Sequence, residues 1–169
     1  MLRVGIIGLR HPHIGSLKGD VRAVPEAAIV AVAEGEPVLQ EKAAQLGGSL
    51  YADYREMLDK ERLDAVGVAA VNSDKGRVIA ECLDRGLHVI VDKPLFTSLE
   101  DLEDVRRAWR RSGKILIAML TLRYEAGALA MHSFVEEGGL GEPVAVTLGA
   151  RRVAFKGFRS FCLNMLDLW

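Results

Sequence analysis

Residues 2–15 decide the fold, and they read LRVGIIGLRHPHIG. The apolar run Leu2–Ile7 predicts a strand, and Gly8 predicts the tight turn that ends it. A helix is expected from Pro12, because proline favours the first turn of a helix. A strand, a glycine turn and a helix form the unit that places helix N–H groups against a phosphate. The stretch therefore predicts the phosphate end of a nucleotide site.

The dinucleotide fingerprint G-x-G-x-x-G is only half present, since Arg10 and His13 occupy its second and third glycine positions. Arg10 is either an exposed loop residue or a direct ligand of a phosphate oxygen. His11 and His13 flank a proline, and their ring N–H groups could face the same anion. A His-x-His pair can also bind a metal ion. We expect no metal site, because no third ligand stands nearby in the sequence.

Composition excludes several classes of function. The 169 residues carry 22 basic and 23 acidic side chains, so no overall charge attracts nucleic acid or a membrane surface. No apolar stretch approaches the roughly 20 residues of a membrane span, and the first apolar run is too short for a signal peptide. Cys82 and Cys162 form no disulfide or metal-binding pattern. We expect a soluble, cytoplasmic protein.

Strand and helix patterns alternate along the chain. Continuous apolar runs predict buried strands at residues 27–33, 63–71, 87–91 and 115–120, with a short strand at 49–51. Helical spacing predicts helices at residues 12–24, 36–46, 53–60, 74–85, 99–111 and 124–137. This order indicates an α/β fold, a doubly wound and mostly parallel sheet. We expect a dinucleotide-binding domain over residues 1–121 and the start of a second domain over 122–169, opened by a strand at 142–152.

Polar residues follow the predicted strands at the edge where open α/β sheets bind ligands. Glu34 ends the second strand, where a carboxylate accepts hydrogen bonds from the adenosine ribose and repels a 2′-phosphate, which favours NAD over NADP. Asp92, Lys93 and Pro94 end a later strand; Lys93 would reach the ligand crevice, and Pro94 permits a cis bond. Asn72 is a further polar group at this edge. Solvated loop positions are the alternative for Lys93 and Glu34.

Other conspicuous residues have structural explanations. Cys82 lies on the inward face of a predicted helix and is expected to pack in the core. One helix carries an arginine cluster on the face opposite its apolar residues Leu102, Val105 and Trp109, which is typical of a solvated surface. The cluster comprises Arg106, Arg107, Arg110 and Arg111.

Taken together, the sequence resembles the Gfo/Idh/MocA oxidoreductases. The matching segments are VGIIG, VAVAE, LDAVGVAAVN, GLHVIVDKP, LRYEAG and EEGGLGEPVAV, and their order and spacing agree over residues 2–148. The resemblance implies an N-terminal Rossmann domain that binds NAD or NADP and a larger second domain that holds a sugar, polyol or cyclitol. Such enzymes pass a hydride between the nicotinamide and a carbon that bears a hydroxyl group.

The resemblance also assigns residues. Lys93 matches the lysine of the E-K-P motif, with Asp92 in place of the glutamate, and would act on the substrate hydroxyl and the nicotinamide ribose. Lys75 stands where a histidine is common. The remaining matches are Gly8 and Glu34 for the cofactor, Asn72 in the loop after a strand, and Arg123 and Tyr124 at the junction with the second domain.

The sequence is compatible with two functions. The first is an NAD-dependent oxidoreductase acting on a sugar or polyol, in which a proton-accepting histidine would still be needed, since family members are about twice as long and carry theirs in the second domain. The second is a nucleotide-binding or regulatory Rossmann protein that does not catalyse. An edge strand at 144–152 and an apolar tail at 155–169 favour self-association, so we expect a homo-oligomer.

Overall fold

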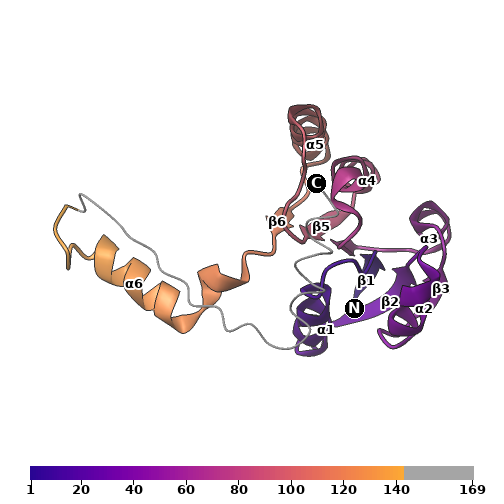
Figure 1. The fold of residues 1–169 in the computed structure, drawn as a ribbon, viewed down its shortest axis with the longest axis horizontal. Helices are drawn as coiled ribbons and strands as arrows, with labels where there is room; N and C mark the ends of the chain where they lie inside the picture. Colours follow the sequence, from indigo (N-terminus) through magenta and orange to yellow (C-terminus); the bar gives the residue numbers. More distant parts are fainter. Residues whose placement is uncertain (143–169) are drawn as a thin grey trace. The chain divides into compact units, whose positions relative to one another are not determined.

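A computed structural model describes residues 1–142. Within them, one sheet contains six strands in the order β3-β2-β1-β4-β5-β6, and every neighbouring pair is parallel (Figure 1). This order is that of doubly wound dinucleotide-binding domains, with the topological switch between β1 and β4. It confirms the predicted fold class. The strands are β1 (Leu2–Ile7), β2 (Ala27–Ala33), β3 (Ser49–Tyr51), β4 (Ala65–Val68), β5 (His88–Val91) and β6 (Leu116–Ala118).

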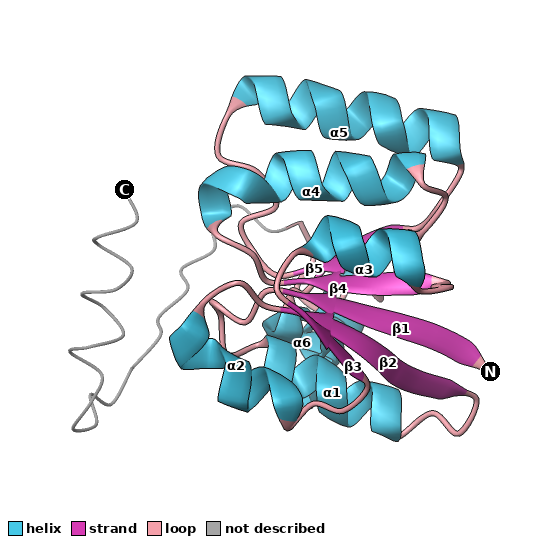
Figure 2. Cartoon of the chain, turned by 90° about the vertical axis from the view of Figure 1, so that its right-hand side faces the viewer, coloured by secondary structure: helices cyan, strands magenta, loops and turns pink. Residues whose placement is uncertain are grey.

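Helices cover both faces of the sheet. Figure 2 shows α1 and α2 on one side and α3, α4 and α5 on the other. Each side has its own apolar cluster: Ile14, Leu17 and Val21 fill the first, and α4 supplies much of the second, including the fully buried Cys82. The helices are α1 (Ile14–Arg22), α2 (Pro37–Ala44), α3 (Tyr54–Lys60), α4 (Asn72–Asp84) and α5 (Leu99–Ser112).

Local sequence signals account for the element boundaries. The Asp53 side chain accepts the N–H of Arg55 and caps α3, and the Ser98 hydroxyl accepts the N–H of Asp101 and caps α5. Gly113 ends α5 with a φ of 63°, which favours glycine. β2 has the predicted bounds, because an unbroken apolar run is well suited to a parallel strand covered on both faces.

Three sequence expectations need correction. β4 is shorter than the predicted 63–71, since the chain after Val68 turns toward the next helix. Asn72 is the first residue of α4 rather than part of a preceding loop. Trp109 is 47% exposed, because Val105 and Ala108 form the buried side of α5. The indole therefore lies beside the core-facing stripe instead of within it.

The chain divides into two units after Leu120. The described part of the second unit contains η1 (Thr121–Tyr124) and α6 (Ala126–Glu136). The strand expected at 142–152 and the apolar tail from residue 155 lie outside the described residues, apart from Glu142 itself. Among the described helices, none combines the length and apolarity that crossing a membrane requires.

Candidate functional site

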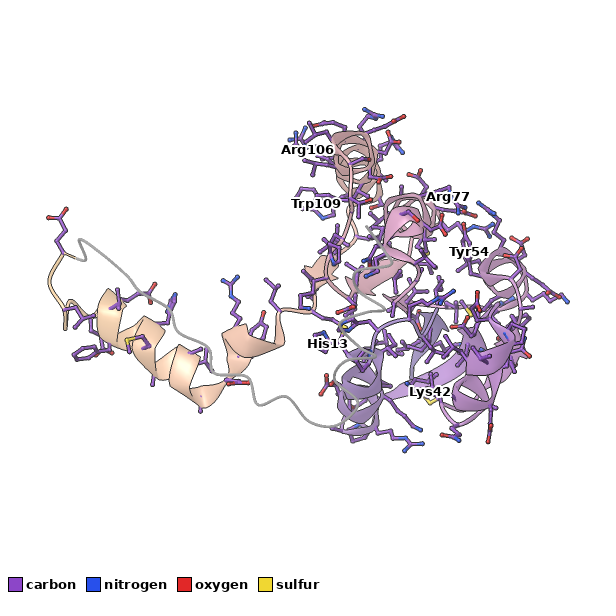
Figure 3. The ribbon with its side chains drawn as sticks, in the orientation of Figure 1. His13, Lys42, Tyr54, Arg77, Arg106 and Trp109 are labelled. Atoms are coloured by element: carbon purple, nitrogen blue, oxygen red, sulfur yellow. The ribbon has the colours of Figure 1, made fainter. Side chains whose placement is uncertain are left out.

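A cleft of about 210 Å³ opens at the carboxyl edge of the sheet, at the ends of β1 and β2 and the start of α4. Its wall includes Gly8 and Arg10 from the turn after β1, and Glu34 and Glu36 from the segment after β2. Tyr54 and Arg77, labelled in Figure 3, line it from α3 and α4. Ligands of open α/β sheets bind at this edge, beside the switch point.

Gly8 is required where it stands. Its φ is +77°, and a Cβ on it would lie 2.8 Å from the backbone oxygen of Ala69 and the backbone of Ala70. Any larger residue would therefore be strained and would collide with the chain after β4. The turn and the chain after β4 are held this close by a hydrogen bond of 3.0 Å from the Arg10 N–H to the Ala69 carbonyl.

The turn after β1 uses its backbone donors within the protein. The N–H groups of Gly8 and Leu9 donate to Ala33 and to the Glu34 carboxylate, each at 2.8 Å. At the start of α1, the N–H groups of Gly15 and Ser16 donate to carbonyls of the preceding turn. These N–H groups of the turn and of the first helical turn therefore already have acceptors within the protein. A phosphate would have to be held here mainly by side chains.

Glu34 is buried at the end of β2, with 5% of its surface exposed. One carboxylate oxygen accepts the Leu9 N–H, and the other accepts the Glu36 N–H, both at 2.8 Å. Each oxygen keeps a second lone pair for another donor. The carboxylate is thus held rigidly by two backbone bonds on the wall of the cleft.

The other charges of the cleft are largely paired. The Arg10 guanidinium contacts the Glu36 carboxylate at 2.7 Å, and both side chains are more than 40% exposed. Arg77 donates to the Tyr54 hydroxyl at 3.0 Å. Burial, together with the hydrogen bond that it donates to Glu81, raises the pKa of Tyr54 to about 12, so the hydroxyl stays protonated. Tyr54 and Arg77 could not be identified from the sequence, because nothing in it indicates that α3 and α4 both line this cleft.

A second group of side chains gathers where β5 ends. The Asp92 carboxylate is fully buried, with His11 Nδ1 3.0 Å from one of its oxygens and His13 Nδ1 2.9 Å from the other. Burial lowers the pKa of His11 below its ordinary value, although Asp92 opposes this shift. In Figure 3, His13 lies at the start of α1, well apart from Arg106 on α5. Asp92 is therefore the third potential metal ligand that the sequence pattern lacked near the two histidines; it lies 79 positions after His13.

Lys75 is the least expected member of this group. Its side chain is only 1% exposed, and its Nζ donates to the backbone oxygens of Asp92 at 3.0 Å and Lys93 at 3.4 Å. Nζ also lies 3.8 Å from the Asp92 carboxylate. Burial lowers the pKa of Lys75, against the opposing effect of Asp92. The only indication of this role in the sequence is the position of Lys75 on the helix that follows β4, near the carboxyl edge of the sheet.

The remaining predicted residues fall in different places. Lys93 is exposed directly after β5, and the Lys93–Pro94 peptide is cis. Asn72, at the start of α4, is not among the described residues that line the cleft. Arg123 and Tyr124 belong to η1 in the second unit, with Tyr124 65% exposed.

Residues 2–120 match the model of the Gfo/Idh/MocA oxidoreductase family, described as an NAD-binding Rossmann fold. The chain belongs to the Gfo/Idh/MocA oxidoreductase family. The match covers the whole sheet and both groups of side chains described above, which confirms the family resemblance seen in the sequence.

Curated relatives of this Gfo/Idh/MocA protein include inositol dehydrogenases. It is 25% identical to a myo-inositol 2-dehydrogenase of Thermotoga maritima, over 89% of this chain and 45% of the relative. It is 30% identical to an inositol 2-dehydrogenase of Saccharopolyspora erythraea, over 85% of this chain and 43% of the relative. The chain thus spans less than half the length of these relatives.

Solved structures share the fold. The myo-inositol 2-dehydrogenase of Lactobacillus plantarum superposes with a TM-score of 0.74 at 23% identity, over 83% of this chain and 42% of that one. The WlbA dehydrogenase of Bordetella pertussis, solved with NADH and UDP-GlcNAcA, gives a TM-score of 0.74 at 22% identity, over 83% and 43%. At these identities the likeness supports the fold of the Gfo/Idh/MocA domain alone.

Proposed function

We propose that this chain is the dinucleotide-binding part of an NAD-dependent oxidoreductase that acts on a hydroxyl group of a sugar, polyol or cyclitol. The observation that carries the proposal is the cleft beside the switch point, in which a rigid buried carboxylate, Glu34, stands at the end of β2. This is the place where dinucleotide-binding folds hydrogen-bond the adenosine ribose.

The charges of the cleft favour NAD over NADP. Three carboxylates line it, from Glu34, Glu36 and Asp74, against the two guanidinium groups of Arg10 and Arg77. A 2′-phosphate would add negative charge to a site that already has an excess of it. An unphosphorylated ribose would instead donate its hydroxyl groups to the second lone pairs of the Glu34 carboxylate.

At the phosphate end of the site, side chains would bind the pyrophosphate in place of the backbone N–H groups that a three-glycine turn uses. Gly8 keeps the sharp turn, but the neighbouring N–H groups bind within the protein. Arg10 is the residue suited to the pyrophosphate, because it can exchange its exposed contact with Glu36 for a bidentate contact with phosphate oxygens. In the imidazolium form, His11 and His13 carry a proton on Nε2 as well as on the Nδ1 that faces Asp92, and each could then donate to a phosphate oxygen.

Bound NAD would supply the hydride acceptor at its nicotinamide. Lys93 is the catalytic residue of the proposal, since its exposed ammonium group stands at the carboxyl edge, directly after β5. From there it would donate a hydrogen bond to the substrate hydroxyl and polarise it. Asp92 and Pro94 fix the loop that carries it, and Asn72 adds a polar group at the same edge. The family resemblance assigns Arg123 and Tyr124, in η1, to substrate binding.

Calorimetric titration of the chain with NADH and with NADPH tests the proposal. We expect saturable binding of NADH and weaker binding of NADPH, and Glu34→Ala should reduce the difference between them. Glu56→Gln is the matched control, because it removes an exposed carboxylate of α3 that pairs only with Lys60 at 2.6 Å among its described ion-pair partners.

The outcomes separate the functions. Failure of both cofactors to bind at millimolar concentration would refute the proposal. Binding of NADH without oxidation of any inositol, sugar or polyol in a substrate panel would refute catalysis by this chain and favour the nucleotide-binding module. Turnover with NAD and one of these substrates would support the oxidoreductase.

A further inference from the structure

The side chains of His11, His13 and Asp92 converge on one point at the carboxyl edge of the sheet. One nitrogen from each imidazole and one carboxylate oxygen all lie within 4.8 Å of one another. The two histidines come from the turn before α1, and Asp92 comes from the end of β5. Both elements are held by the parallel sheet, so this convergence is a product of the fold rather than of a local sequence motif.

The contacts within this group are poorly explained by hydrogen bonds alone. The Asp92 Oδ2 atom is fully buried and accepts no hydrogen bond with acceptable geometry from the described residues, although His11 Nδ1 lies only 3.0 Å away. The same Nδ1 accepts the backbone N–H of His13 at 3.3 Å. A ring nitrogen that accepts a hydrogen bond is unprotonated, so its electron pair lies close to a second acceptor, Asp92 Oδ2. Such a pair of acceptors is stabilised by a cation between them; Lys75 Nζ, 3.8 Å from Oδ2, offsets part of the charge but makes no hydrogen bond to that oxygen.

We propose that His11 and His13, through their Nδ1 atoms, and the Asp92 carboxylate bind a divalent transition-metal ion of the zinc class. Two imidazole nitrogens and one carboxylate form a ligand set that suits zinc and its neighbours better than magnesium, which prefers oxygen alone. Three protein ligands leave a fourth position open, as in zinc sites that bind water or a ligand oxygen. The long contact from the His13 N–H to His11 Nδ1 is replaced when the ion binds.

The distances are close to those of such a site. Ligand atoms 2.0–2.2 Å from a tetrahedral zinc ion are about 3.3–3.6 Å apart. His11 Nδ1 lies 3.0 Å from Asp92 Oδ2, His13 Nδ1 lies 2.9 Å from Oδ1, and one ligand atom from each residue lies within 4.8 Å of the others, so modest side-chain rotations would bring them around one ion. The imidazoles are 17% and 28% exposed, so the ion has a path from solvent while the carboxylate stays buried.

The Lys75 ammonium group should limit the affinity of the site for a metal ion. Its Nζ lies 3.8 Å from the Asp92 carboxylate and competes with the metal for that charge. We therefore expect a dissociation constant on the order of 1 µM rather than the tighter binding of a structural zinc site. This inference does not depend on the proposed NAD function, because the ligands are complete without a nucleotide.

The test uses the untagged full chain after treatment with a chelator. Calorimetry should give one Zn²⁺ per chain and no binding of Mg²⁺, and Co²⁺ should give a visible absorption spectrum typical of nitrogen and oxygen ligands. His13→Ala should weaken Zn²⁺ binding about a hundredfold or more, since even outer partners of metal ligands contribute 10–100-fold. Asp92→Asn should do the same, and circular dichroism establishes that each variant is folded.

His132→Ala is the matched control. It removes an exposed imidazole on α6, whose described ion-pair partner is Glu136, and should leave Zn²⁺ binding unchanged. Absence of Zn²⁺ binding to the native chain would overturn the proposal. So would binding that survives His13→Ala and disappears with Cys162→Ser, because the ion would then be held by a thiol elsewhere.

Discussion

The Glu34 carboxylate accepts the backbone N–H of Leu9 at 2.8 Å, and this bond ties the end of β2 to the turn after β1. The residue that we propose to recognise a ribose is therefore also part of the support of the turn. Because the Leu9 side chain is buried as well, the bond lies in a region that water does not readily reach.

Glu34→Ala should affect both roles. The Leu9 N–H loses its buried acceptor, which costs about 1–3 kcal/mol of the free energy of unfolding, as urea titration can measure. The preference for NADH over NADPH should fall in the same variant. Glu36→Gln, which keeps the Leu9 bond, should leave the urea midpoint close to that of the native chain. An unchanged midpoint for Glu34→Ala would show that the turn does not depend on this bond.

Gly8→Ala should destabilise the fold. The positive φ costs about 1–3 kcal/mol for a residue with a Cβ, and the 2.8 Å approach to the backbone of Ala69 adds to it. Gly15→Ala is the contrasting variant, because α1 leaves open space around that position. It should stabilise the protein by about 0.5–1 kcal/mol. Equal midpoints for the two variants would contradict this account of the turn.

Lys75→Met should lower the free energy of unfolding by about 3–5 kcal/mol, since it leaves the Asp92 carboxylate buried beside an apolar group. Guanidinium titration measures the loss. In the double variant with Asp92→Asn, part of the stability should return, because the uncompensated charge is removed. Strict additivity of the two single changes would mean that Lys75 and Asp92 do not interact.

Cys82 should make the folded chain less stable at alkaline pH. Burial raises the pKa of its thiol to about 12 in the folded chain, whereas an unfolded thiol ionises near 8.5. The free energy of unfolding is unaffected by ionisation of this thiol below about pH 8.5. Above that pH it falls by about 1.4 kcal/mol per pH unit, because only the unfolded chain then releases the proton. Stability measured at pH 8 and pH 10 should therefore differ less in Cys82→Ala than in the native chain.

Most of the fold was predictable from the sequence, because it depends on local patterns. The unbroken apolar run of β2 and the glycine at position 8 each specify their structure within a few residues. Strand alternation then leads to a parallel sheet, since short connections and right-handed crossovers leave few other arrangements. β4 and Trp109 were predicted less well, because their boundaries depend on which residues the neighbouring helices cover.

The candidate site was predictable only in part. Single residues at strand ends, such as Glu34 and Lys93, can be found because the carboxyl edge of a parallel sheet is a known binding position. The contacts of Asp92 with His13 and with Lys75 join residues 79 and 17 positions apart, so no spacing rule reveals them. The sequence favoured no metal site for the same reason, since the third candidate ligand, Asp92, follows a distant strand.

Because the amides of the turn after β1 donate within the protein, this loop becomes ordered when the chain folds rather than when a ligand binds. A loop that awaits its ligand loses conformational entropy at the moment of binding, whereas this loop loses it during folding. Its amide protons should thus exchange slowly even without nucleotide. A ligand that arrives meets a preorganised surface, and its affinity is not reduced by the need to order the loop.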